Sequence, residues 1–118
     1  MIIGTGVDIV DISRMNEKIS KKILSDKELL IYNSFSSEKR KNEYLAGRFA
    51  IKECLVKALG RSLNFNMISI INDENGKPIL TEKTIKYINE KFGRFRIHLT
   101  ISHEKNYAIG FVIIESEG

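Results

Sequence analysis

Two carboxylates, a lysine and a histidine from three separate segments could together act on a phosphate group. Asp8 lies in an apolar segment near the start of the chain, and Glu53 and Lys57 stand four residues apart near its middle. His103 follows Ser102 near the end. Because Mg²⁺ is commonly held by one or two carboxylates with water and substrate phosphates, Asp8 and Glu53 would be sufficient ligands. A lysine and a histidine would contact phosphate oxygens. The implied chemistry is phosphoryl transfer or phosphodiester cleavage.

These residues also have ordinary structural interpretations, which the sequence leaves open. Asp8 can cap a turn or pair with a lysine, and Glu53 with Lys57 has the spacing of a helical ion pair worth about 0.2–0.5 kcal/mol. A histidine in a polar loop, such as His103, is often incidental. His98, which alternates within a predicted strand, has no motif around it and is interpreted as structural. No local spacing brings the three segments together.

Residues 48–57 place four charges on a helix that otherwise has a buried pattern. At 100° per residue the apolar positions cover about half of the helix circumference, and Arg48 and Lys52 point into that apolar arc. Burying an unpaired charge costs several kcal/mol, so these groups need internal counter-ions or a bound anion and metal. For Lys52 the pattern predicts either a buried ion pair or a subunit contact.

Composition and charge limit the kind of protein and its partners. The 118 residues are 42% hydrophobic and 29% charged, which predicts one globular domain spanning 1–118 with a real core. The formal net charge of +4 favours an anionic partner: nucleic acid, a phosphorylated small molecule or an acidic protein. No apolar run approaches the roughly 18 residues of a membrane span, and no signal-peptide pattern is present, so we expect a cytoplasmic protein with no membrane partner. The lone Cys54 excludes an internal disulfide and is interpreted as an ordinary buried thiol.

Periodicity and capping residues predict an α+β fold, a single small domain with an antiparallel sheet packed on a long central helix. That helix begins at Ser36 or Ser37, runs to Leu59 and ends at Gly60, with Gly47 as a weak point. Ser25 and Glu28 have the spacing of a capping box. The other predicted elements are a strand at 2–10, a short helix after Asp11, strands at 68–72 and 78–80, a helix between Thr81 and Gly93, and a hairpin of strands at 95–102 and 107–115.

Four sequence blocks resemble the small 4′-phosphopantetheinyl transferases of the holo-[acyl-carrier-protein] synthase type. The blocks are Gly-Thr-Gly-Val-Asp-Ile-Val at 4–10, Ala-Gly-Arg-Phe-Ala-Ile-Lys-Glu-Cys-Leu-Val-Lys-Ala-Leu-Gly at 46–60, Asn-Gly-Lys-Pro at 75–78 and Ile-Ser-His-Glu-Lys-Asn-Tyr-Ala at 101–108. They span nearly the whole chain in the family's order. The resemblance implies transfer of phosphopantetheine from coenzyme A to a serine of apo-acyl carrier protein in fatty acid biosynthesis, with release of adenosine 3′,5′-bisphosphate.

The resemblance also implies roles for particular residues. Asp8 and Glu53 match the family's Mg²⁺ ligands, and Lys57 and His103 match its pyrophosphate-side residues. The positions that match nucleotide contacts are Arg48, Gly60 and Pro78, with Lys39 and Arg40 at the 3′-phosphate. The basic early segment with Arg14, Lys18, Lys21 and Lys22 would face the acidic carrier protein. The family further implies a homotrimer with coenzyme A between protomers.

Two competing functions and one mechanistic choice stay open at this level. A metal-dependent phosphodiesterase or nuclease could use Asp8 and Glu53 without a carrier protein. A basic nucleic-acid-binding domain is disfavoured because no recognition signature appears, so we expect no nucleic acid partner. The proton of the attacking serine would pass to a metal-associated water or to a carboxylate, and the residues do not decide between them.

Overall fold

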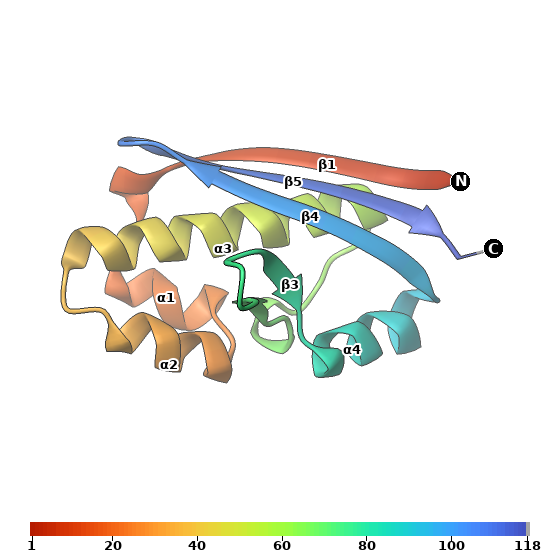
Figure 1. The fold of residues 1–118 in the computed structure, drawn as a ribbon, viewed down its shortest axis with the longest axis horizontal. Coiled ribbons are helices and arrows are strands. Elements are labelled where there is room, and N and C mark those ends of the chain that lie inside the picture. Colours follow the sequence, from red (N-terminus) through yellow and green to blue (C-terminus); the bar gives the residue numbers. More distant parts are fainter. Residues whose placement is uncertain (118) are drawn as a thin grey trace.

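A 22-residue helix, α3 (Glu38–Leu59), lies along a three-stranded antiparallel sheet of order β1-β5-β4 (Figure 1). The structure is a computed structural model and describes residues 1–117. The sheet strands are β1 (Ile2–Asp11), β4 (Phe95–His103) and β5 (Tyr107–Ser116). The predicted α+β fold, an antiparallel sheet on a long central helix, is confirmed.

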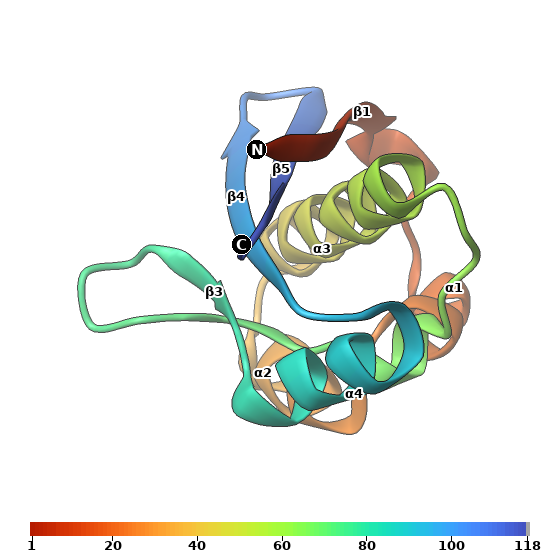
Figure 2. The same ribbon diagram turned by 90° about the vertical axis from the view of Figure 1, so that its right-hand side faces the viewer.

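The remaining elements cover the side of α3 that faces away from the sheet (Figure 1). They are the 3-10 turns η1 (Ile12–Arg14) and η2 (Phe65–Met67), the helices α1 (Glu17–Ile23), α2 (Asp26–Ser34) and α4 (Glu82–Phe92), and the strands β2 (Ile70–Asn72) and β3 (Pro78–Leu80). β2 and β3 form a separate two-stranded sheet. The loop that joins them projects from the body of the molecule (Figure 2).

Close approach of the sheet to α3 depends on glycines in the first strand. A Cβ atom added to Gly4 would overlap the carbonyl of Ala58, and one added to Gly6 would overlap the carbonyl of Cys54. Only a residue without a side chain therefore fits at either position. Because side chains alternate along a strand, Asp8 shares the helix-facing side of β1 with these glycines. The strand and the helix are thus close where the candidate carboxylates lie.

The opposite face of the sheet carries exposed apolar side chains. β1 contributes Ile3, Val7 and Ile9, and β5 contributes Tyr107, Ile109 and Phe111. Val7 lies opposite Phe111 in the ladder, and Ile9 lies opposite Ile109, so these four side chains adjoin one another, with Ile3 and Tyr107 further along the same face. We call this surface the outer apolar face. Apolar patches of this kind commonly mark interaction sites.

A buried ion pair joins α3 to α2. The Lys52 ammonium and the Glu28 carboxylate have no exposed side-chain surface and lie 2.5 Å apart. Lys52 Nζ also donates to the carbonyl oxygens of Ile23 and Phe65, at 2.8 and 3.0 Å. Burial lowers the pKa of Lys52, and the carboxylate of Glu28 opposes that shift. Of the two explanations that the sequence left open for Lys52, the structure selects the buried ion pair.

Glu28 also satisfies backbone groups that would otherwise be unpaired. Its Oε1 accepts from Ser25 N in the predicted capping box, and its Oε2 accepts from Ile70 N at the start of β2. One carboxylate therefore joins α2, α3 and the small sheet. Four hydrogen bonds from a buried pair make its loss costly, because each freed group would keep its desolvation penalty.

The predicted ends of the long helices agree with the structure: Ser37 caps α3, Gly60 ends it in the left-handed conformation with φ of 70°, and Thr81 caps α4. The helix predicted after Asp11 is only the 3-10 turn η1, and α1 begins separately after Asn16.

Gly47 is not a weak point, since α3 continues through it without a break; a Cβ atom there would lie 3.1 Å from Ile101 of β4, so the glycine allows close packing. The strand predicted from residue 68 begins at Ile70.

None of the helices within residues 1–117 combines the length and the apolar character needed to cross a lipid bilayer.

Replacing Lys52 by Met should lower the free energy of unfolding by about 3–5 kcal/mol, because Glu28 would keep a buried charge without its partner. Guanidinium unfolding followed by circular dichroism measures the change. The matched control is Lys27→Met, which removes an exposed lysine of α2 and should stay within about 0.5 kcal/mol of the parent. Equal losses in the two variants would show that the ion pair is not a main support of the fold.

Candidate active site

A cavity of about 260 Å³ brings Asp8 of β1 beside Glu53 of α3. We call it the carboxylate cavity. Its lining residues are Asp8, Ile9, Val10, Arg14, Met15, Phe49 and Glu53. The two carboxylates predicted to act together therefore share one cavity, although they are 45 positions apart in the chain. Their proximity depends on the glycines of β1, which let this strand approach α3.

Lys57 forms an ion pair with Asp8. Pairing of Asp8 with a lysine was one of the alternatives that the sequence left open, and Lys57 is that lysine. Lys57 Nζ donates to Asp8 Oδ1 and to the Val7 carbonyl oxygen, both at 2.9 Å. The hydrogen bond to Asp8 raises the pKa of Lys57, so the ammonium stays charged at neutral pH. Two of its three N–H groups are thus used, and the third is available to a bound anion. Within residues 1–117, Glu53 has no ion pair with Lys57 or with another cation.

The donor set of the carboxylate cavity fits a hard divalent cation. Asp8 and Glu53 supply only oxygen atoms, and no group of three or more His, Cys, Asp or Glu side chains gathers as a metal cluster in residues 1–117. Two carboxylates with open positions suit Mg²⁺, which retains water and takes substrate phosphates as further ligands. A closed structural zinc site, by contrast, would need four protein ligands.

A second cavity, of about 180 Å³, lies on the β4 side of α3 and contains several cations. We call it the anion cavity. Its lining residues are Arg40, Glu43, Tyr44, Gly47, Arg48, Asn72, Gly76, Pro78, Ile101 and His103. Four of the predicted contact residues, Arg40, Arg48, Pro78 and His103, therefore meet here. They come from α3, the β2–β3 hairpin and the end of β4.

Arg48 is held in a fixed orientation at this cavity. Its Nε donates to the Ile70 carbonyl oxygen at 3.3 Å, and its Nη2 donates to Asn72 Oδ1 at 3.2 Å. The guanidinium also lies over the ring of Tyr44, 4.4 Å from the centroid. These contacts explain how a residue with 6% exposure retains its charge. Its remaining N–H groups can contact an anion in the cavity.

The structure separates His103 from the Asp8 side of the same chain. His103 lines the anion cavity, which shares no lining residue with the carboxylate cavity. The two cavities lie on different sides of α3: Gly47 and Phe49, one from each cavity, are about 200° apart around the helix axis at 100° per residue. One chain thus presents two separate cavities on opposite faces of one helix.

The other predicted site residues lie outside the two cavities or at their edges. Arg14 lines the carboxylate cavity, next to α1, where Lys18, Lys21 and Lys22 are exposed. Lys39 and Gly60 are exposed near the two ends of α3 and line neither cavity. The roles of Lys39 and Gly60, like those of the other predicted site residues, stay predictions.

Sequence reasoning missed several residues of the two cavities. Glu43 and Tyr44 line the anion cavity, and Phe49 lines the carboxylate cavity. Glu43 is three residues after Arg40, which places both on one side of a helix. That spacing was the available signal for Glu43. Nothing in the local sequence indicated that Asn72 would hold the guanidinium of Arg48.

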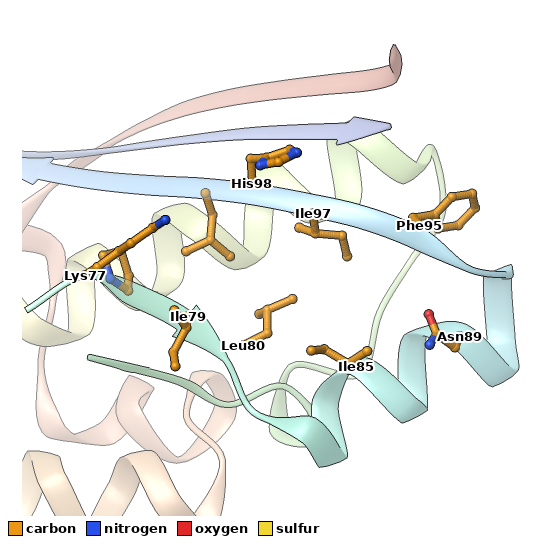
Figure 3. A pocket seen from close by; sticks show the side chains of 10 residues that line it. Lys77, Ile79, Leu80, Ile85, Asn89, Phe95, Ile97 and His98 are labelled. Atoms are coloured by element: carbon orange, nitrogen blue, oxygen red, sulfur yellow. The ribbon is translucent and has the colours of Figure 1, made fainter. Parts of the chain in front are cut away.

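A third cavity, of about 310 Å³, is largely apolar and lies between β3, α4 and β4 (Figure 3). Ile79, Leu80, Ile85 and Ile97 contribute to its walls, and Lys77 and His98 stand at its border. It shares Pro78 with the anion cavity. His98 itself hydrogen-bonds Glu115 across the sheet at 2.7 Å, in agreement with its structural interpretation.

Cys54 is fully buried on α3. Burial raises the pKa of its thiol to about 11, with a further contribution from the charge of Asp8. A thiol with such a pKa is protonated at neutral pH and is a poor nucleophile. Cys54 is therefore a packing residue, as the sequence predicted.

Comparison with known proteins places the chain in a family. The model of the 4′-phosphopantetheinyl transferase superfamily matches residues 4–112. A holo-[acyl-carrier-protein] synthase from Petrotoga mobilis is 47% identical over 118 residues, which cover 99% of each chain. The crystal structure of a holo-(acyl-carrier-protein) synthase from Bacillus anthracis, in complex with CoA (3′,5′-ADP), superposes with a TM-score of 0.82 and 35% identity, covering 99% of both chains. The chain belongs to the 4′-phosphopantetheinyl transferase superfamily.

Proposed function

We propose that this chain is a holo-[acyl-carrier-protein] synthase, which transfers 4′-phosphopantetheine from coenzyme A to a serine of apo-acyl carrier protein. The observation that carries the proposal is the meeting of Asp8, Glu53 and Lys57 where β1 approaches α3. Full-length similarity to proteins named for this activity supports it. A phosphodiesterase or nuclease gains no support from the comparisons.

The reaction exchanges the phosphoanhydride bond of the coenzyme A pyrophosphate for a phosphoester bond to serine. The serine Oγ of the carrier protein forms a bond to the phosphorus that bears the pantetheine arm, and the bond from that phosphorus to the oxygen of the leaving phosphate breaks. Adenosine 3′,5′-bisphosphate leaves with the electron pair, and the serine proton is released toward the carboxylate cavity. Such a transfer is accelerated mainly by positioning and by stabilisation of charge on the transferred group.

Asp8 and Glu53 would hold Mg²⁺, which when bound supplies positive charge to the phosphate oxygens and lowers the pKa of bound water. The carboxylates orient this side of the site and can accept the serine proton directly or through a water. Lys57, fixed by Asp8 and by the Val7 carbonyl, directs its remaining N–H to a phosphate oxygen of the pyrophosphate.

The anion cavity is the proposed site of the adenosine bisphosphate end of coenzyme A. Arg40, Arg48 and His103 would contact phosphate oxygens, and Pro78 would border the nucleoside. This end carries the phosphate groups that cations recognise, whereas the carboxylate cavity has the ligands for a metal. The anion cavity and the carboxylate cavity would thus contact opposite ends of the reacting pyrophosphate.

A homotrimer would bring the carboxylate cavity of one copy beside the anion cavity of the next. The outer apolar face leaves Val7, Phe111 and their neighbours exposed on a single chain, and burying such a surface stabilises association. Because one chain holds its two cavities on opposite sides of α3, a ligand that spans both needs the carboxylate cavity of one copy beside the anion cavity of another. These two observations support a site between protomers.

Carrier protein would dock on the basic helix α1. Lys18, Lys21 and Lys22 are exposed there, and Arg14 connects that surface to the carboxylate cavity. Carrier proteins of this family are acidic, so opposite charge would steer them to the place where their serine meets the transferred phosphate. Arg14 would then contact the carrier close to the serine.

Purified protein with Mg²⁺, coenzyme A and apo-acyl carrier protein should give a carrier heavier by one phosphopantetheine. Intact-mass spectrometry measures the gain, and a reaction without coenzyme A is the blank. The absence of a mass gain with several carrier proteins would overturn the transferase proposal. Release of nucleotide products from nucleic acid or a phosphodiester, in the same preparation, would support the hydrolase instead.

Glu53→Gln should reduce transfer by on the order of 10²-fold or more, because a neutral amide would neither hold the cation nor accept a proton. The circular dichroism spectrum should be unchanged, since the substitution keeps the side-chain volume. Glu38→Gln is the control, because Glu38 is an exposed glutamate of the same helix outside both cavities. Near-normal transfer by the Glu53 variant would remove this residue from the metal site.

Reversing the charge of Lys18, Lys21 and Lys22 to Glu should raise the KM for carrier protein by about tenfold or more, with kcat changed little. Steady-state kinetics at fixed coenzyme A measures both constants. The control reverses three exposed lysines of α4, Lys83, Lys86 and Lys91, and therefore changes the net charge equally. Equal effects of the two triple variants would place the docking surface elsewhere.

Light scattering should report three times the chain mass of 13.5 kDa for the parent protein. Phe111→Glu should produce a smaller species with little transferase activity, because a charge would be buried in the outer apolar face. The control is Leu30→Glu, which alters an exposed leucine of α2, 75% exposed, away from that face. A monomeric parent with full activity would exclude the trimeric site.

A further inference from the structure

Glu43 introduces a carboxylate into a cavity whose other ionisable side chains include Arg40, Arg48 and His103. It is the only acidic residue among the described residues that line the anion cavity. Its side chain is 14% exposed, and the nearest basic group, His103 Nδ1, lies 4.0 Å from Oε2, beyond hydrogen-bond distance. The side chain is thus mostly buried, and its carboxylate, which still reaches water at the cavity, has no hydrogen bond among residues 1–117.

The neighbouring residue on α3 has the same shortage of partners. The Tyr44 hydroxyl is the one buried side-chain polar atom in residues 1–117 without a hydrogen bond, and Tyr44 lines the same cavity. Burial raises the pKa of Tyr44 to about 12. Polar groups withdrawn from water are normally hydrogen-bonded, which the Tyr44 hydroxyl is not. This wall of the cavity therefore lacks hydrogen-bond donors that a ligand could supply.

The adenosine bisphosphate end of coenzyme A has donors at two places, the ribose 2′-hydroxyl and the 6-amino group of adenine. The ribose hydroxyl is adjacent to the carbon that bears the 3′-phosphate, and a carboxylate there would be repelled by the phosphate charge. The 6-amino group is the donor far from both phosphates. Electrostatics therefore assigns the phosphates to the arginines and the amino group to the carboxylate.

We propose that Glu43 is a specificity-determining residue, whose carboxylate accepts a hydrogen bond from the 6-amino group of the adenine. This inference rests on the proposed function, because it needs the nucleotide end in the anion cavity. It explains why a cavity for anions contains a mostly buried glutamate. A base with a carbonyl oxygen at position 6 would bring two acceptors together and would be rejected.

The test compares binding of two nucleotides that differ at this one group, adenosine 3′,5′-bisphosphate and inosine 3′,5′-bisphosphate. Calorimetry in the presence of Mg²⁺ should give the parent protein a Kd at least about tenfold lower for the adenosine compound. Glu43→Gln should bring the two Kd values within about threefold, because a carboxamide can accept from an amine or donate to a carbonyl. Glu38→Gln, on the same helix, should keep the preference of the parent.

Two outcomes would overturn the proposal: a parent protein that binds both nucleotides equally, or a Glu43 variant that keeps the full preference. A folded Glu43 variant is verified by an unchanged circular dichroism spectrum. Carrier modification with coenzyme A, measured on the parent, tests the proposed function separately. Normal transfer without a base preference would refute only the role of Glu43, whereas a base preference without transfer would refute only the transferase activity.

Discussion

The buried contact between Lys52 and Glu28 is the interaction on which the arrangement of α3 depends. Its two charges lie in the interior between α2, α3 and β2, and every N–H of the ammonium has an acceptor. Because Glu28 also accepts from Ile70 N, the pair orients the small sheet that carries Asn72. Asn72 in turn holds Arg48 at the anion cavity. A buried ion pair contributes less to stability than to a single defined arrangement, and here that arrangement determines where a site residue points.

A second constraint acts on the opposite side of α3, where glycines bring the sheet against the helix. Gly4 and Gly6 leave no space for side chains, so β1 lies at a distance that places Asp8 beside Glu53 and Lys57. The elements packed against α3 therefore determine the surroundings of each of its charged side chains. Lys52 is a structural cation, Arg48 lines the anion cavity, Glu53 lines the carboxylate cavity, and Lys57 pairs with Asp8.

The carboxylate cavity and the anion cavity lie on opposite sides of α3, and this arrangement is the reason for proposing a site between copies. Hydrogen bonds hold Arg48 on one side of the helix and Lys57 on the other. The outer apolar face offers the surface through which copies would associate. Helix α3 contributes both to the hydrophobic core and to the linings of the two cavities. The Glu43 carboxylate, which has no hydrogen bond within residues 1–117, is the acceptor in the proposed contact with a ligand.

Local sequence was enough to predict the long central helix, the main strands, several helix caps and the residue types of the chemistry. Capping residues such as Ser25, Ser37 and Thr81 act locally, so their effect is readable without a fold, and the motif around Glu53 indicated the family. It did not determine which charges meet. Lys57 pairs with Asp8 rather than with its helical neighbour Glu53, Lys52 finds Glu28 across 24 positions, and His103 lies apart from Asp8. Such pairings depend on how closely strands and helices pack, and packing is a property of the whole chain.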